Sequence, residues 1–373
     1  MSDGSDKQAY FLKRSALQSL LDAVAARGYQ CVGPTLQDQT IHYQNITKIG
    51  QLPRGLRDKQ TPGRYQVTHA GDERLFAWAH GPQGLKPYVF ASEEVLWRSK
   101  RNDDGSLQFE EMPAVENKVA VLGARACDIA ALYIQDKHFI QGSYQDPYYA
   151  SRRQNLIIIA VNCTDPADTC FCASTGDGPR AAYGYDIALT ELEDGYIIES
   201  RSQFGAEIMQ QIPIEPASRD QTYAAQGAIA SAARQQTRRL PSRDLKKALF
   251  SNLDHAQWED IAKRCLACGN CTSVCPTCFC HSETDQAQID GKSSEHLRQW
   301  DSCFTSGHSY IHGITIRANT AQRYRQWLTH KLGSWHDQYG RSGCVGCGRC
   351  ISWCPVGIDI THEVSVICKG DNQ

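Results

Sequence analysis

Two runs of four cysteines stand in the last third of the chain. Both runs have the spacing C-x2-C-x2-C-x3-C, and a proline follows each of them. The first run is Cys265, Cys268, Cys271 and Cys275, and the second is Cys344, Cys347, Cys350 and Cys354. In bacterial two-cluster sites with this spacing, three close thiolates bind one cluster and the fourth binds the other. The runs therefore predict two [4Fe–4S] clusters.

The crossing of the fourth cysteine gives the expected ligand sets. One cluster is expected to use Cys265, Cys268, Cys271 and Cys354. The other is expected to use Cys344, Cys347, Cys350 and Cys275. Zinc is the alternative metal, but structural zinc sites favour C-x2-C pairs set apart by a spacer. Two complete runs, each closed by proline, favour iron–sulfur clusters instead.

Nine of the 17 cysteines lie outside these ligand sets, and seven of them form two further candidate metal sites. The tetrapeptide Thr-Cys-Phe-Cys occurs at 169–172 and again at 277–280. The first candidate site is Cys127, Cys163, Cys170 and Cys172. The second is Cys278, Cys280 and Cys303, with a fourth ligand to come from His281, His308 or Asp301. The alternative for both sets is that they are small buried hydrophobic residues.

The elements around these cysteines indicate an α/β core. Residues 118–123 and 156–161 are continuous apolar runs, typical of strands buried on both faces, and a helical stretch follows at 128–133. Cys127 and Cys163 come just after these strands. Since parallel strands end at the same edge of a sheet, the loops of the first candidate site are expected to meet there. An amphipathic helix is predicted over 10–28.

The C-terminal region is expected to be mainly helical. In all, 69 positions separate Cys275 from Cys344, more than a compact two-cluster domain needs, and a helical stretch at 320–332 lies between them. Its Arg323, Arg325 and Lys331 form either a docking face or an ordinary solvated face. The predicted fold class is α+β. An α/β domain over 1–240 would carry the possible extra iron–sulfur site, and a helical ferredoxin-like domain over 241–373 would carry the two clusters.

Composition excludes several classes of protein. The net charge of -2 gives no indication of nucleic-acid binding. The first residues are polar and lack a secretory signal, and the longest strongly apolar run has about six residues, against roughly 20 for a membrane-spanning helix. The sequence therefore predicts a cytoplasmic protein without a membrane span, in which cysteines serve as metal ligands rather than disulfides.

Beyond the ferredoxin runs, the chain resembles a known family over nearly its whole length. It is similar to the β subunit of soluble [NiFe] hydrogenases of the sulfhydrogenase type, a family that includes the A subunit of anaerobic sulfite reductase. The segments that carry the resemblance are 81–83, 121–128, 146–149, 162–164, 169–174, 275–280, 300–303, 324–332 and 343–350. The resemblance implies electron transfer between a catalytic subunit and a flavin-bearing diaphorase-type subunit or a soluble carrier.

Three interpretations follow. The first is a relay subunit of a hydrogenase or of a sulfur or sulfite reductase, not catalytic alone. The second is a self-contained oxidoreductase that binds flavin or substrate in the N-terminal domain. The third is an interaction module with structural clusters. The sequence has no recognised catalytic base, nucleophile, nickel site or sirohaem motif, which favours the first. The expected cofactors are two [4Fe–4S] clusters, with one or two further clusters at the candidate sites.

Overall fold

The computed structural model describes residues 9–114, 116–289 and 291–369. Its largest element is an eight-stranded sheet with the order β12-β1-β11-β10-β9-β8-β2-β3. The strands are β1 (Tyr10–Lys13), β2 (Gln30–Gln37), β3 (Thr40–Asn45), β8 (Val119–Ala124), β9 (Leu156–Val161), β10 (Ile187–Glu191), β11 (Gly195–Ser200) and β12 (Ile214–Pro216). The four central strands β10, β9, β8 and β2 are parallel, and the outer pairs are antiparallel.

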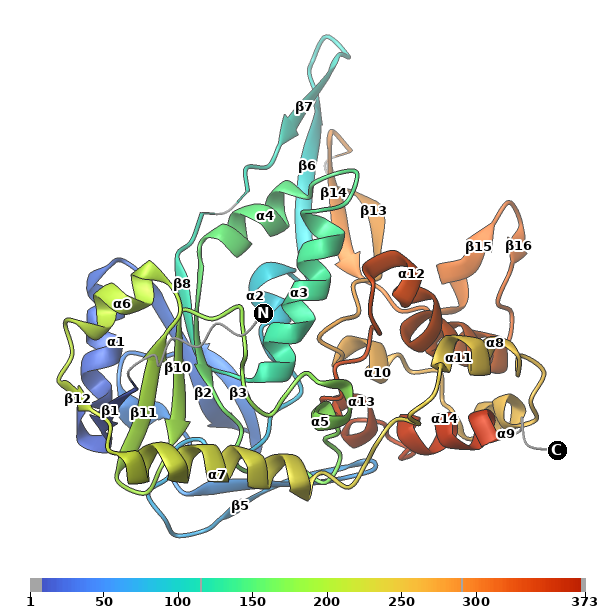
Figure 1. Cartoon of the computed structure of the whole chain (residues 1–373). Helices are drawn as coiled ribbons and strands as arrows, with labels where there is room; N and C mark the ends of the chain where they lie inside the picture. The colour runs from blue at the N-terminus through green and yellow to red at the C-terminus, as the bar shows by residue number, and fades with distance from the viewer. Residues whose placement is uncertain (1–8, 115, 290, 370–373) are drawn as a thin grey trace.

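Helices cover both faces of this sheet (Figure 1). The helices of this part are α1 (Leu17–Ala26), α2 (Lys86–Val89), α3 (Ala126–Phe139), α4 (Pro147–Gln154), α5 (Cys172–Thr175), α6 (Gln203–Met209) and α7 (Arg219–Gln235). Leu122 and Ile159 pack with α1 and α6 on one face, while Val121 and Ile158 pack with α3 and α4 on the other. The continuous apolar runs are therefore strands buried on both sides, as predicted.

The N-terminal segment differs from its sequence prediction, because residues 10–13 form a strand and the helix begins only at Leu17. Phe11 and Leu12 belong to different core clusters, so they lie on opposite faces of the sheet. The apolar residues from Leu17 onward have helical spacing, and the prediction extended that spacing back over the short strand. A short 3-10 turn, Arg14–Ala16, joins the two elements.

The C-terminal part is mainly helical, and all of its helices except the one at 335–339 share one apolar core. They are α8 (Leu245–Phe250), α9 (Gln257–Arg264), α10 (Asn270–Ser273), α11 (Thr320–Thr329), α12 (Trp335–Tyr339), α13 (Arg349–Ser352) and α14 (Ile360–Cys368), with a π-helical turn at His330–Ser334 between α11 and α12. The chain thus combines a sheet-rich N-terminal part with a helical C-terminal part, and the predicted α+β class is confirmed. The boundary at residue 240 stays a prediction.

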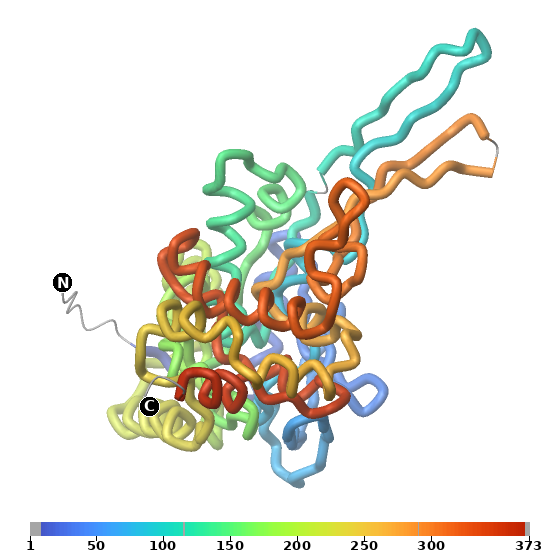
Figure 2. Tube along the Cα trace, turned by 90° about the vertical axis from the view of Figure 1, so that its right-hand side faces the viewer, coloured from blue at the N-terminus to red at the C-terminus, as the bar shows by residue number. Residues whose placement is uncertain are grey.

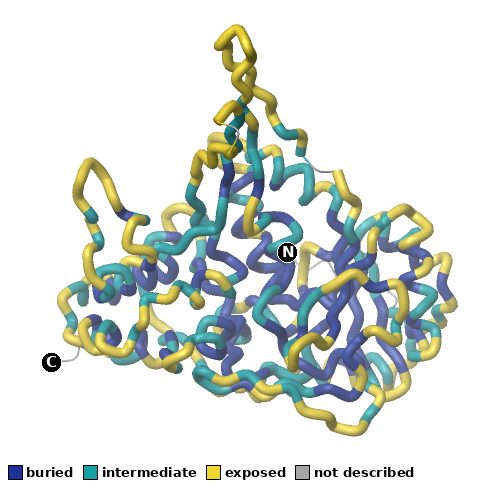
Figure 3. Tube along the Cα trace, turned by 180° about the vertical axis from the view of Figure 1, so that it is seen from behind, coloured by how far each residue is buried: buried dark blue, intermediate teal, exposed yellow. Residues whose placement is uncertain are grey.

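A four-stranded antiparallel arm, with the order β13-β14-β6-β7, projects from the body (Figure 2). Its strands are β6 (Glu93–Arg101), β7 (Leu107–Glu111), β13 (His281–Ala287) and β14 (Ser293–Trp300). Two segments nearly 200 residues apart pair here, since His296 is opposite Trp97. The outer part of the arm is exposed (Figure 3).

The remaining elements are small. They are the hairpins β4 (Leu56–Thr61) with β5 (Arg64–His69) and β15 (Tyr310–Ile311) with β16 (Ile314–Thr315), and the 3-10 turns Ile49–Gln51 and Ser306–Ser309. Over the described residues, none of the helices has the length and apolar character that crossing a bilayer requires.

Candidate iron–sulfur centres

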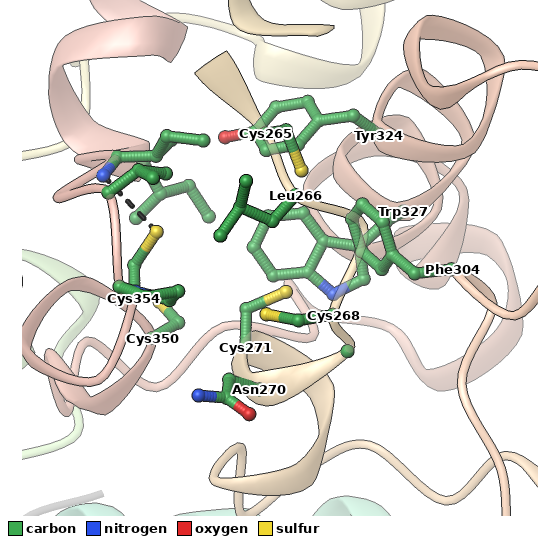
Figure 4. Close-up of a pocket in the computed structure, with 15 residues that line it drawn as sticks. Cys265, Leu266, Cys268, Asn270, Cys271, Phe304, Tyr324, Trp327, Cys350 and Cys354 are labelled. Atoms are coloured by element: carbon green, nitrogen blue, oxygen red, sulfur yellow. Dashed lines mark hydrogen bonds between the residues drawn. The ribbon is translucent and has the colours of Figure 1, made fainter.

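The first centre is a space between α9, α10 and the end of α13. Cys265 follows the last residue of α9, Cys271 lies on α10, and Cys354 lies just beyond α13. Ala267 and Gly269 have positive φ angles of 51° and 77°, which turn the loop so that Cys268 faces the same space. Figure 4 shows the four predicted ligands around one apolar cavity, which Phe304, Tyr324, Trp327 and Cys350 also line.

The surroundings of this space fit an iron–sulfur cluster. The backbone N–H of Ala267 lies 3.4 Å from the sulfur of Cys265, and that of Ile358 lies 3.3 Å from the sulfur of Cys354. Such N–H groups stabilise cluster-bound thiolates. Burial raises the pKa of Cys271 well above its usual value, and the neighbouring thiols add to the shift. Metal coordination would deprotonate these thiols and satisfy the site.

The second centre gathers Cys344, Cys347, Cys350 and Cys275. Burial raises the pKa of the first three thiols, and Cys275 is close enough to add to the shift of each. The N–H of Gly346 lies 3.5 Å from the sulfur of Cys344. The structure therefore brings together both predicted ligand sets, although they combine segments 69 or more positions apart.

The loop that carries Cys344, Cys347 and Cys350 lies directly on the N-terminal part. Phe171 donates a 2.8 Å backbone hydrogen bond to the carbonyl of Gly346. A Cβ on Gly346 would come within 2.6 Å of the Phe171 backbone, and one on Gly348 within 2.3 Å of the Thr169 carbonyl oxygen. Only glycine permits this approach. The second centre and the first Thr-Cys-Phe-Cys segment are thus in backbone contact.

A buried ion pair fixes the same junction. Arg349 donates to both carboxylate oxygens of Asp128 on α3, at 2.7 and 3.0 Å, and to the carbonyl of Gly81 at 2.9 Å. Arg349 is fully buried, and Asp128 is 1% exposed. A buried charge of this kind requires a partner, so Arg349 and Asp128 depend on each other.

The third group of thiols, Cys127, Cys163, Cys170 and Cys172, gathers where β8 and β9 end. Burial raises the pKa of Cys170, and Cys172 and Cys163 contribute. Burial likewise raises the pKa of Cys127, to which Cys172 and Cys347 contribute. Cys172 also packs in one cluster with Cys127 and Cys347. The four thiols therefore lie within a single neighbourhood, beside the second centre.

The fourth group, Cys278, Cys280 and Cys303, lies between the second centre and the base of the arm. Cys275 lies beside Cys278 and raises the pKa of its thiol, and Cys303 and His308 lie beside Cys280 and lower the pKa of its thiol. Asp301 contacts Nδ1 of His308 at 2.5 Å. Over residues 9–114, 116–289 and 291–369, no three Cys, His, Asp or Glu side chains are arranged to hold a single metal ion.

Three buried residues lie near the thiols although nothing in the sequence indicated that they would. The ring nitrogen Nε2 of His80 lies 3.7 Å from the sulfur of Cys170 and also contacts the carbonyl of Cys347. Lys331 donates to the sulfur of Cys275 at 3.4 Å. Lys86 lies 3.6 Å from the ring centroid of Trp300. Their neighbours are distant in sequence, so local patterns could not reveal them.

The sequence left two alternatives for the helix at 320–332, a docking face or a solvated face, and Lys331 fits neither. Lys331 is only 3% exposed and points into the thiol region. Arg323 donates to the carbonyls of Phe304 and Arg317, and Arg325 to that of Leu253. These three cations therefore serve contacts within the chain.

Comparison with known proteins gives one match to the C-terminal part and one match to most of the chain. Residues 264–358 match the family described as 4Fe-4S dicluster domain. The chain is 27% identical over 331 residues to Sulfhydrogenase 2 subunit beta of Pyrococcus furiosus, which covers 88% of this chain and 95% of the relative. No solved structure matches. These findings confirm the resemblance: the chain is a homologue of a sulfhydrogenase β subunit, and its dicluster domain fits an iron–sulfur electron-transfer protein.

Proposed function

We propose that this chain is a cytoplasmic electron-relay subunit with two [4Fe–4S] clusters ligated in the crossed manner. One cluster uses Cys265, Cys268, Cys271 and Cys354, and the other uses Cys344, Cys347, Cys350 and Cys275. The catalytic partner is a [NiFe] hydrogenase or a sulfur or sulfite reductase. The other partner is a flavin-bearing diaphorase-type subunit or a soluble carrier.

The carrying observation is the continuity of the thiol groups through the molecule. Cys350 lines the cavity of the first centre and belongs to the loop of the second. Cys347 of that loop packs against Cys127 and Cys172 of the third group. A relay requires redox centres that lie next to one another in space. Here each group of thiols lies beside the next.

We assign a third cluster to Cys127, Cys163, Cys170 and Cys172. Gln236 supports this site, since its side-chain amide donates to the sulfur of Cys172 at 3.4 Å. Three buried thiols and one half-buried thiol at one sheet edge would contribute little more to packing than other small apolar side chains. A cluster here would extend the relay to the edge of the large sheet. It would give the N-terminal part a redox role.

The protein's own residues would protect and orient the bound clusters, which supply one-electron chemistry. Aromatic side chains such as Phe304 and Trp327 form part of the apolar wall of the first centre. Backbone N–H groups of Ala267, Gly346 and Ile358 donate to ligand sulfurs and lower their negative charge. These contacts would adjust the reduction potentials of the clusters. An electron-transfer role of this kind does not require a substrate pocket.

The test uses the full chain, purified anaerobically without partners. About eight irons are expected for two clusters and about twelve with the third. Dithionite should bleach the visible absorption and produce EPR signals. The isolated chain should not oxidise hydrogen, reduce sulfite or react with nicotinamide nucleotides.

Hydrogen uptake or sulfite reduction by the single chain would contradict a relay role, and an iron-free chain would contradict the cluster assignment. Co-purification of the tagged chain with a nickel-containing subunit would assign it to the hydrogenase branch. Co-purification with a sirohaem-containing subunit would assign it to the reductase branch.

A further inference from the structure

Three thiols outside both ferredoxin ligand sets surround the base of the arm. Cys280 immediately precedes β13, and Cys303 lies three residues beyond β14. The backbone N–H of Asp301 donates to the carbonyl of Cys280 at 2.9 Å, which closes the two ends of the hairpin. Cys278 and Cys280 also line a recess that reaches Cys268 of the first centre. The hairpin therefore holds Cys280 and Cys303 together.

Two buried lysines face these thiols and have no carboxylate partner. Lys86 is 5% exposed and Lys331 is 3% exposed. Neither forms an ion pair in the described part of the chain. The ammonium of Lys331 contacts the hydroxyl of Thr277 at 2.7 Å, the sulfur of Cys275 and the carbonyl of Gly343. Lys86 lines the same recess as Cys278 and Cys280.

A buried ammonium without a counter-charge is strongly unfavourable. Neutral thiols cannot supply that charge, whereas thiolates bound to metal can. The second cluster supplies negative charge near Lys331 through Cys275. Lys86 lies against Trp300 and lines the same recess as Cys278 and Cys280, so it indicates an anionic group held by these thiols.

His308 is the histidine that completes a set of four donors. One of its ring nitrogens contacts Asp301, and the ring lies beside Cys280, which raises its pKa. Histidine ligands to metals commonly have a carboxylate on the other ring nitrogen, which orients them. His281 instead contacts the carbonyl of Phe279 at 3.2 Å and packs on Phe90. Asp301 is occupied by His308 and by the N–H of Ser302.

We propose that Cys278, Cys280, Cys303 and His308 hold a further iron–sulfur cluster, with Lys86 and Lys331 as its counter-charges. The proposal rests on the relay function above. The site adjoins the second centre, because Cys278 directly follows Thr277, whose hydroxyl lies 3.2 Å from the sulfur of Cys275. An iron–sulfur cluster gains a full negative charge on reduction, and two buried ammonium groups suit such a centre better than a zinc ion of fixed charge.

The experiment compares the anaerobically purified full chain with Cys303→Ala. Iron, sulfide and zinc are measured per chain, and EPR spectra are recorded after dithionite reduction. Cys303→Ala should lose about four irons if the cluster is a cubane, and should keep the signals of the two ferredoxin-type clusters. Cys31→Ala is the matched control, because Cys31 is a buried thiol on β2 whose sulfur contacts only the backbone carbonyl of Leu21.

Equal iron in Cys303→Ala and the wild type would overturn the proposal while leaving the relay function intact. Zinc that is present in the wild type and absent from Cys303→Ala would overturn the iron–sulfur assignment. A wild-type chain without any iron would instead overturn the proposed function itself. Cys170→Ala separates this site from the N-terminal one, since the iron losses should add in the double variant.

Two conservative variants keep the test decisive if Cys303→Ala fails to fold. His308→Cys should retain iron and lose the 14N hyperfine coupling that a ligating imidazole gives to a reduced cluster. Lys86→Met should retain iron and shift one reduction potential downward, because a positive charge near a cluster favours its reduced form. An unchanged nitrogen coupling in His308→Cys, or unchanged potentials in Lys86→Met, would contradict the assigned donor or counter-charge.

Discussion

At the residue scale, the placement of Cys354 gives the most direct test of the crossed ligation. Its sulfur lies on the wall of the first cavity, beside Cys265 and Cys271, although its own run is the second. Cys354→Ser should therefore damage the first cluster and spare the second. EPR of the reduced variant should show one signal lost or converted to a three-iron form. Loss of the signal that responds to Cys344→Ser would show that the crossing is wrong.

The ion pair between Arg349 and Asp128 makes a second prediction at this scale. Arg349→Met leaves a buried carboxylate without its partner and should cost about 3–5 kcal/mol of stability. Anaerobic urea unfolding, followed by cluster absorption, measures the change. The double variant with Asp128→Leu should recover much of the loss, since it removes the orphaned charge. A double variant as unstable as the sum of both single variants would contradict coupling between the residues.

Individual residues were predictable where the signal was local. The eight ferredoxin-type cysteines stand in two short runs, and the structure gathers both expected ligand sets. Lys331 shows the opposite case. Its surroundings are set by Thr277 and Cys275, which are more than 50 positions away. The helix-face pattern therefore predicted an outward-facing side chain, whereas Lys331 is a buried cation.

At the scale of elements, the loop from Cys344 to Cys350 depends on glycines. Gly346 has a φ of 65°, and a Cβ there would strike the backbone of Phe171. Gly346→Ala should lose about 1–3 kcal/mol to this overpacking, beyond the conformational cost of about 1 kcal/mol. The second cluster's EPR signal should weaken or shift, and urea unfolding should report the added instability.

Gly176→Ala is the matched control for that variant. Gly176 has a φ of 75°, and a Cβ there would meet nothing within 4 Å. The control should therefore show the conformational cost alone, with unchanged cluster signals. Equal destabilisation of Gly176→Ala and Gly346→Ala would mean that the contact with Phe171 carries no weight.

The strands of the core were predictable and those of the arm were not. Leu156–Val161 is a run of apolar residues, so its burial on both faces follows from composition. The strands β7 and β13 are largely exposed, and the central pair of the arm, β6 with β14, joins segments nearly 200 residues apart. Pairing of this kind is decided by tertiary contacts rather than local propensity.

At the scale of the whole molecule, the centres differ in their distance from solvent. Cys268 is exposed and Leu266 beside it is 64% exposed, whereas Cys344 and Cys347 are buried. Iron should therefore leave the first centre before the second when the chain is treated with ferricyanide and a chelator. Time-resolved EPR and iron release should show two phases. The Cys354→Ser variant should lack the fast phase, and simultaneous loss of all signals would contradict the gradient.

This gradient also bears on how such a protein survives contact with oxygen. The outermost cube would be the first to be attacked, while the loop that carries Cys344, Cys347 and Cys350 stays sealed behind Arg349 and Asp128. Damage would then leave a folded chain in which only the outer cluster-binding site has lost its cluster. Reinsertion of iron and sulfide at this outer centre would then not require the loop at 344–350 to unfold.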